Sequence, residues 1–263
     1  MDLSGLVLTP GARCSAFGRI VAVGDAMTFE PDLPRRLVTY APGREPAARP
    51  TDLGVPVRGV DLADLLDRRE KQGAVEGWAV LEGSWQGDGL RVLAQRAVRP
   101  PAQSYPDWTT PPCPEPPAGW PVGDELELPP AYEELRAVGL VVNGTIFHPL
   151  GRGPVLVVAA TYPARVAAVL GPQMGQRLCV IRSNYRADEV DSVRRQVADR
   201  FHGWKMYASG DGSAGDGQIV LEIHLVRVLP EMARWATEVP DGLLRVIPWL
   251  GPNHRLVVAE LAR

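Results

Sequence analysis

The stretch from Trp108 to Pro121 reads WTTPPCPEPPAGWP, and it divides the chain into parts of different character. It lies within residues 100–130, which hold 11 of the 26 prolines and five acidic residues but no basic one. Because each proline fixes φ and lacks an N–H donor, neither a helix nor a central strand is expected here. We therefore predict a semi-rigid, acidic, Pro-rich connector at 100–130 between an N-terminal domain, 1–99, and a C-terminal domain, 131–263.

Two tryptophans, Trp108 and Trp120, bracket the densest run of prolines. In one interpretation the run is a polyproline ligand for an aromatic groove on a partner. In the other, both tryptophans fold back and hold the connector on the domains, because large aromatic side chains are usually at least partly buried. Both residues are candidate binding residues.

The N-terminal part is predicted to be rich in β-structure. Alternating runs at 17–23 and 27–30 flank the turn Gly24-Asp25, and runs at 78–85 and 90–95 flank a Gly-containing turn at 86–89. Between them, residues 60–68 have the leucine spacing of a short helix, with Asp61 as its N-cap. Short strands with one helix favour a small barrel of the OB type; a β-sandwich or an open meander is the alternative.

The C-terminal part alternates between strands and helices. We expect strands at 154–160, 178–182, 204–209, 219–228 and 244–249, and helices at 163–170, 187–200 and 230–238. From residue 178 onward the order is βαββαβ, which is typical of a ferredoxin-like plait, and a further βα unit precedes it. The predicted fold class is therefore α+β.

An internal repeat is visible in the same region. The segment 155–181, with Tyr162-Pro163 before its helix, parallels 223–247, with Leu229-Pro230 before its helix; the offset is 67 residues at the two prolines and closes to 66 at the end. This suggests two related βαβ units flanking one sheet. Chance similarity between generic βαβ units is the alternative.

Composition and charge exclude several classes of protein. The 263 residues are 45% hydrophobic and 22% charged with a net charge of −3, as in a globular protein, and no apolar run approaches the length of a membrane span. Only Lys71 and Lys205 are lysines among 28 basic residues, a bias typical of high-G+C coding. No segment concentrates basic residues, so neither nucleic acid nor membrane is an expected partner.

Three cysteines, Cys14, Cys113 and Cys179, lie far apart and form no CxxC motif. We expect three reduced thiols, with Cys179 a small core residue. The first eight residues have no basic start and no long apolar stretch, so no secretory signal is expected and a cytoplasmic location is predicted.

No catalytic signature is found. The histidines, His148, His202, His224 and His254, show no metal-binding spacing, and His224 is expected to lie opposite Ile223 and Leu225 on its strand. There is no G-x-S-x-G, P-loop or G-x-G-x-x-G motif. The Gly-rich loop 209–217 offers oxygens from Asp211, Ser213 and Asp216 but lacks EF-hand spacing, so a hairpin loop is the better interpretation. No cofactor and no metal are predicted.

One dense charged cluster lies at the start of the helix at 187–200. It consists of Asp188, Glu189 and Asp191, with Arg182 and Arg186 nearby. The two arginines are candidate binding residues, while acids in a first helical turn are ordinary partners of the helix dipole. The cluster supports at most an enzyme with an inter-domain site of unknown reaction.

Three segments carry a resemblance to a known group. They are Trp108 to Pro121, the join 226–233 (VRVLPEMA) and the closing 240–244 (PDGLL). They resemble a family of uncharacterised proteins from high-G+C bacteria over most of the chain. The resemblance implies no activity, so no site residue is carried over from it.

These observations lead to one main hypothesis about function. We expect a non-catalytic, cytoplasmic module that binds another protein, as an adaptor, a regulator or a toxin-neutralising partner. The alternatives are the inter-domain enzyme and an OB-type binder of nucleic acid or oligosaccharide. The oligomeric state stays open.

Overall fold

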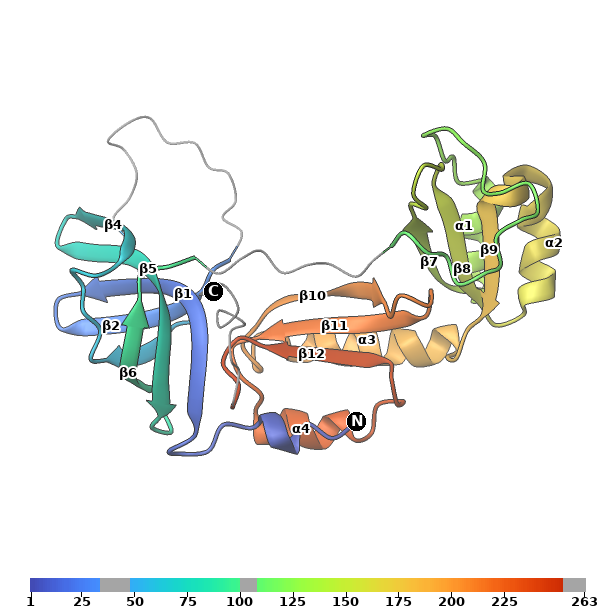
Figure 1. Ribbon diagram of the computed structural model, residues 1–263. Helices are drawn as coiled ribbons and strands as arrows, with labels where there is room; N and C mark the ends of the chain where they lie inside the picture. The colour runs from blue at the N-terminus through green and yellow to red at the C-terminus, as the bar shows by residue number, and fades with distance from the viewer. Residues whose placement is uncertain (34–47, 100–107, 253–263) are drawn as a thin grey trace.

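The computed structural model describes residues 1–33, 48–99 and 108–252. It is a mixed α+β structure with three sheets, which confirms the predicted fold class (Figure 1). One sheet belongs to the N-terminal part of the chain, and two three-stranded sheets belong to the C-terminal part.

The N-terminal unit contains β1 (Arg13–Val23), β2 (Ala26–Pro31), β3 (Val55–Arg58), β4 (Leu66–Lys71), β5 (Ala74–Trp85) and β6 (Leu90–Arg96). Both predicted hairpins, β1–β2 and β5–β6, are confirmed. β1 pairs antiparallel with β2 and with β5, while β3 pairs antiparallel with β2 and parallel with β6. The pairings therefore lead from β1 through β2, β3, β6 and β5 back to β1.

The predicted helix at 60–68 is wrong. Residues 61–65 form turns and a bend, and β4 begins at Leu66. The carboxylate of Asp61 accepts a hydrogen bond from the N–H of Ala63 at 2.9 Å, which is an Asx turn and not a helix cap. Asp67 then has a φ of 53°, a left-handed conformation that a helix cannot include.

The C-terminal part contains two copies of one arrangement, helix–strand–strand–helix–strand. The first repeat comprises α1 (Pro130–Ala137), β7 (Val141–Phe147), β8 (Val155–Ala160), α2 (Pro163–Met174) and β9 (Leu178–Arg182). The second comprises α3 (Ala187–Arg200), β10 (Met206–Ser213), β11 (Ile219–Leu225), α4 (Pro230–Ala236) and β12 (Leu244–Pro248). In each repeat an antiparallel hairpin is followed by a helix that starts with proline and by a parallel strand.

The single ferredoxin-like plait is wrong, because β9 does not join β10, β11 and β12 in one sheet. It pairs in parallel with β8, whose other edge pairs with β7, a strand absent from the sequence prediction. Because β7 is present, the parallel strands β8 and β9 have an antiparallel neighbour in β7, just as β11 and β12 have one in β10. The repeat is therefore real, but its two units form two sheets and do not flank one (Figure 1).

Strand β8 shows why the connector belongs to the first repeat. All six of its residues, VLVVAA, are buried. Leu156, Val158 and Ala160 pack with residues of α1 and α2, whereas Val155 and Val157 pack with Trp108, Cys113 and Trp120. A continuous apolar strand needs cover on both faces. Helices supply one cover, and the Pro-rich run supplies the other.

The second repeat shares its cores with the beginning of the chain. Leu3 is buried among residues of β10–β12, α3 and α4, and Val7 forms a parallel bridge with Val228. At the other end, Val226 and Leu250 enter the core of the N-terminal unit. The Nε1–H of Trp249 donates to the carbonyl of Phe17 at 2.7 Å, and its ring lies 4.5 Å from that of Phe29. These contacts dock the second repeat on the N-terminal unit.

Candidate functional site

Trp108 and Trp120, the candidate binding residues of the connector, lie against the first repeat. Trp120 is buried, and Trp108 packs edge-on against Phe147 with 5.3 Å between ring centroids. The backbone is held at both ends, since the N–H of His148 donates to Trp108 and the N–H of Gly153 donates to Pro121, at 2.7 and 2.8 Å. This placement agrees with the second of the two interpretations, in which the tryptophans hold the connector on the fold.

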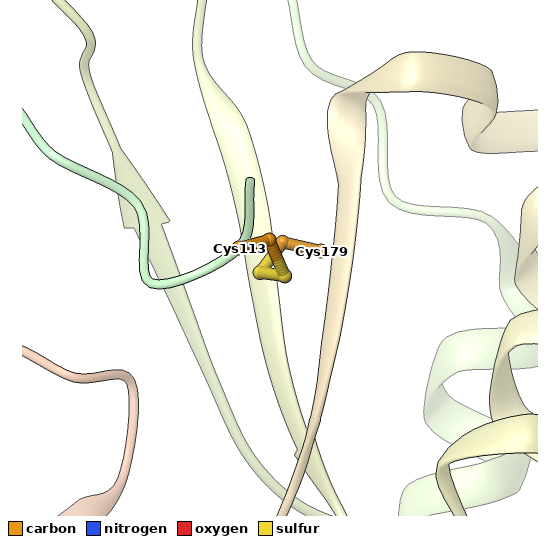
Figure 2. Close-up of a disulfide and its surroundings, with 2 residues drawn as sticks. All are labelled: Cys113 and Cys179. Carbon is orange, nitrogen blue, oxygen red and sulfur yellow. A yellow bond between two sulfur atoms is a disulfide. The ribbon is translucent and has the colours of Figure 1, made fainter. Parts of the chain in front are cut away.

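A disulfide fastens the middle of the same segment. Figure 2 shows Cys113 in the connector joined to Cys179 in β9. The expectation of three reduced thiols is therefore wrong: only Cys14 is free among the described residues, and it is buried. Burial raises the pKa of the Cys14 thiol to about 11, which makes it a poor nucleophile at neutral pH. The pairing could not be seen in the sequence because 66 residues separate the two cysteines.

Among the histidines, His224 lies beside a carboxylate on β11. His224 lies opposite the buried Ile223 and Leu225, as predicted. It is 3.7 Å from Glu222, whose other carboxylate oxygen accepts a 2.6 Å hydrogen bond from Arg245. The nearby Tyr207 is shielded enough that burial raises its pKa to about 12. His254 lies outside the described residues.

The charged cluster at the start of α3 is satisfied locally. Arg186, a candidate binding residue, forms a two-pronged pair with Asp188, and Glu189 accepts the N–H of Arg186 at 2.8 Å. Asp191 pairs with Arg194. These bonds cap the helix and satisfy its acids, which is the ordinary role considered for them.

The Gly-rich loop is shorter than predicted: residues 209–213 extend β10 and pair with β11, and only 214–218 form the turn of the hairpin. Asp211 pairs with Arg194, Ser213 is buried and faces the N–H of Gly215, and Asp216 accepts the N–H of Gln218. In the part of the chain that the structure describes, no group of three or more histidine, cysteine or acidic residues could hold a metal ion. Nor does any helix there have the length and apolarity to span a bilayer.

The remaining candidate, Arg182, belongs to an open hollow of about 630 Å³ at the carboxyl ends of β8 and β9. We call it the basic hollow; it is lined by Tyr162, Pro163, Ala164, Arg165 and Arg182. Tyr162 is 61% exposed, and within the described residues neither Arg165 nor Arg182 forms a side-chain hydrogen bond or ion pair. Thr161, the residue before Tyr162, donates to the carbonyls of Leu140 and Gly139 and so holds the segment that follows α1 next to the end of β8; Val138 in this segment is 69% exposed.

The second repeat has an end equivalent to that of the basic hollow, and a corresponding backbone hydrogen bond in each repeat identifies the equivalent positions. The N–H of Ser183 donates to Ala160 at 2.9 Å, just as the N–H of Trp249 donates to Leu225 at 2.8 Å. In the second repeat the N-terminal unit covers this end, where Arg227 stacks on Trp85 at 5.0 Å. In the first repeat, as far as the described residues show, this end is covered on the β9 side alone, where Gln218 donates to the carbonyl of Arg182 and accepts the N–H of Asn184.

Sequence reasoning identified Arg182 but missed Tyr162 and Arg165. The signal was present in the repeat, because Tyr162 takes the place of the apolar Leu229 before a Pro-started helix. An aromatic side chain at this position indicates a binding surface only once the structure shows that this end is covered in the second repeat and, in the described residues, open in the first.

Comparison with known proteins gives no match: no family model, no curated protein and no solved structure is significantly similar to this chain.

Proposed function

We propose that this chain is a protein-binding module and that the basic hollow of the first repeat is its binding surface. The observation that carries the proposal is the difference between the two repeats. The same end of the same arrangement is buried against a β-rich unit in the second repeat, whereas the described residues leave it largely open in the first.

The residues of the basic hollow have the chemistry of an interface centre. Tyrosine and arginine are the types most enriched among residues that dominate binding energy. Tyr162 lines the hollow together with two arginines whose guanidinium groups have no ion-pair partners in the described chain, and the exposed Val138 follows α1 nearby in the fold. The second repeat already binds a protein surface at the matching place by stacking an arginine on a tryptophan.

Quantitative affinity capture from lysate of the source cells tests the proposal. The bait is the whole chain, compared with Tyr162→Ala/Arg182→Ala. The matched control is Leu93→Ala/Arg69→Ala, which removes an exposed apolar side chain and an exposed arginine from the N-terminal unit. A partner retained by the wild type and the control but lost from the hollow variant supports the proposal; identical capture by all three contradicts it.

We further propose that the N-terminal unit is an OB-type barrel. The support is its order of pairing, β1-β2-β3-β6-β5-β1 with β3 and β6 parallel, which is the order of five OB strands when β4 is taken as an insertion. A hollow of about 530 Å³ lies beside β3 and the β5–β6 turn, and Arg58, Arg91 and Asp88 are among the residues that line it.

This hollow supports a second candidate function, binding of a short oligosaccharide or single strand of nucleic acid. Fluorescence anisotropy with labelled single-stranded DNA, RNA and a sulfated oligosaccharide at low salt tests it. Binding that Arg58→Ala/Arg91→Ala weakens supports this function, and absence of binding to all three probes removes it.

A further inference from the structure

A second exposed surface of the first repeat has the chemistry opposite to that of the basic hollow. Residues 122–128, with the sequence VGDELEL, form what we call the acidic segment. Asp124, Glu125 and Glu127 are exposed, Val122 is 72% exposed and Leu128 is 42% exposed. The segment thus presents three carboxylates and two apolar side chains to solvent, while Leu126 packs on the core of the first repeat.

The backbone at the start of the acidic segment is fixed in place. Arg177 donates to the carbonyls of Val122 and Gly123 at 2.8 and 3.3 Å, and also to the carbonyl of Pro154 at 3.3 Å. Pro154 directly precedes β8 and Arg177 directly precedes β9. The acidic segment therefore begins at the amino ends of the two strands, whereas the basic hollow lies at their carboxyl ends.

We propose that two copies of this chain associate head to tail, with the acidic segment of one copy seated in the basic hollow of the next. This inference rests on the proposed function and names the partner as a second copy. Arg165 and Arg182 would pair with Asp124 and Glu125, while Tyr162 and Val138 would cover the apolar side chains. Each copy presents both surfaces at opposite ends of one sheet, so a copy cannot satisfy its own pair.

A contact between two different surfaces of the same chain is heterologous, and it does not close unless the rotation between copies completes a ring. Association is therefore expected to grow with concentration beyond a dimer. Because charged groups dominate both surfaces, it is also expected to weaken as salt screens them.

Sedimentation velocity of the whole chain, over a concentration series up to about 1 mM and at low and high salt, tests the inference. Variant A is Arg165→Glu/Arg182→Glu, and variant B is Asp124→Arg/Glu125→Arg. Each variant alone carries like charges on both surfaces, so its self-association is expected to weaken about tenfold or more. An equimolar mixture of A and B pairs opposite charges at every junction and is expected to restore association.

Restoration in the mixture, after loss in each variant alone, supports the inference and shows that neither variant is merely misfolded. Three results overturn it: a wild type that stays monomeric throughout, a variant A that associates like the wild type, or a mixture that does not associate. The proposed function is judged separately, since capture of another protein that depends on Tyr162 would stand even if the chain never self-associates.

Discussion

Cys113 and Cys179 lie with their Cα atoms 5.8 Å apart, and their disulfide joins the Pro-rich cover of the first repeat to β9. The bond closes a long loop, and such cross-links typically stabilise a domain by about 2 to 4 kcal/mol. We expect Cys113→Ser to lower the free energy of unfolding by about that amount in urea titrations and to admit proteases to residues 108–121. Reduction of the wild type should reproduce the effect; unchanged stability in both cases would contradict it.

The same bond gives the predicted cytoplasmic location a test, because disulfides persist in oxidising compartments and are rare in the reduced cytoplasm. Trapping thiols with an alkylating reagent in intact cells, followed by mass spectrometry, reports the pair directly. Cys113 and Cys179 both alkylated before reduction would agree with the cytoplasmic prediction. Their protection would place the chain where the bond can form.

A single glycine explains how β7 passes α1. A Cβ at Gly144 would overlap the hydroxyl of Tyr132, which is buried against this strand. We expect Gly144→Ala to destabilise the chain by about 1 to 3 kcal/mol in chemical denaturation, because α1 or β7 must shift. Gly210 in β10 is the matched control: it also lies in a strand, and a Cβ there meets nothing within 4 Å, so Gly210→Ala is expected to stabilise by about 0.5 to 1 kcal/mol.

Local pattern predicted most of the elements but not their partners. Val190, Val193 and Val197 mark α3 unambiguously, and the turn residues between Trp85 and Leu90 mark the β5–β6 hairpin. By contrast, β7 contains Asn143-Gly144 in its middle, residues that are depleted in strands. Without β7, the pairing of β9 could not be assigned, and a single sheet was the simplest arrangement.

The candidate site shows the same limit. Arg182 and Arg186 were both identified from their charge. Arg186, however, forms a two-pronged ion pair with Asp188, whereas Arg182 has no ion-pair partner in the described residues. Which of two exposed arginines forms an ion pair depends on where the side chains lie in the folded structure, and the sequence does not show this. For Trp108 and Trp120, too, only the packed structure decides between ligand and cover.

Trp249 is expected to be the principal link between the second repeat and the N-terminal unit. Trp249→Ala removes the ring packed on Phe29 and the hydrogen bond to Phe17, so a loss of about 3 to 5 kcal/mol is expected in urea unfolding. Trp249→Phe keeps most of the ring contact but loses the hydrogen bond. We therefore expect it to lower the free energy of unfolding by about 1 kcal/mol for the lost hydrogen bond, in addition to the smaller loss from the reduced ring size. Equal effects of the two variants would show that the ring is not the source of the stability.

The buried Cys14 is expected to make the free energy of unfolding fall as the pH rises in the alkaline range. Its thiol has a pKa of about 11 in the fold, because burial disfavours the thiolate, against an ordinary value of 9.0. The folded state thus holds this proton more tightly than the unfolded state does, and the resulting stability is fully present below pH 9.0 and is lost as pH rises toward about 11.

Urea unfolding of the wild type and of Cys14→Ala across pH 8 to about 11 tests this dependence. The free energy of unfolding should decline less in the variant, after allowance for its lost packing. Parallel declines in the two proteins would contradict the assignment, as would rapid alkylation of Cys14 in the folded protein at pH 8, where the buried thiol is expected to stay protonated and unreactive.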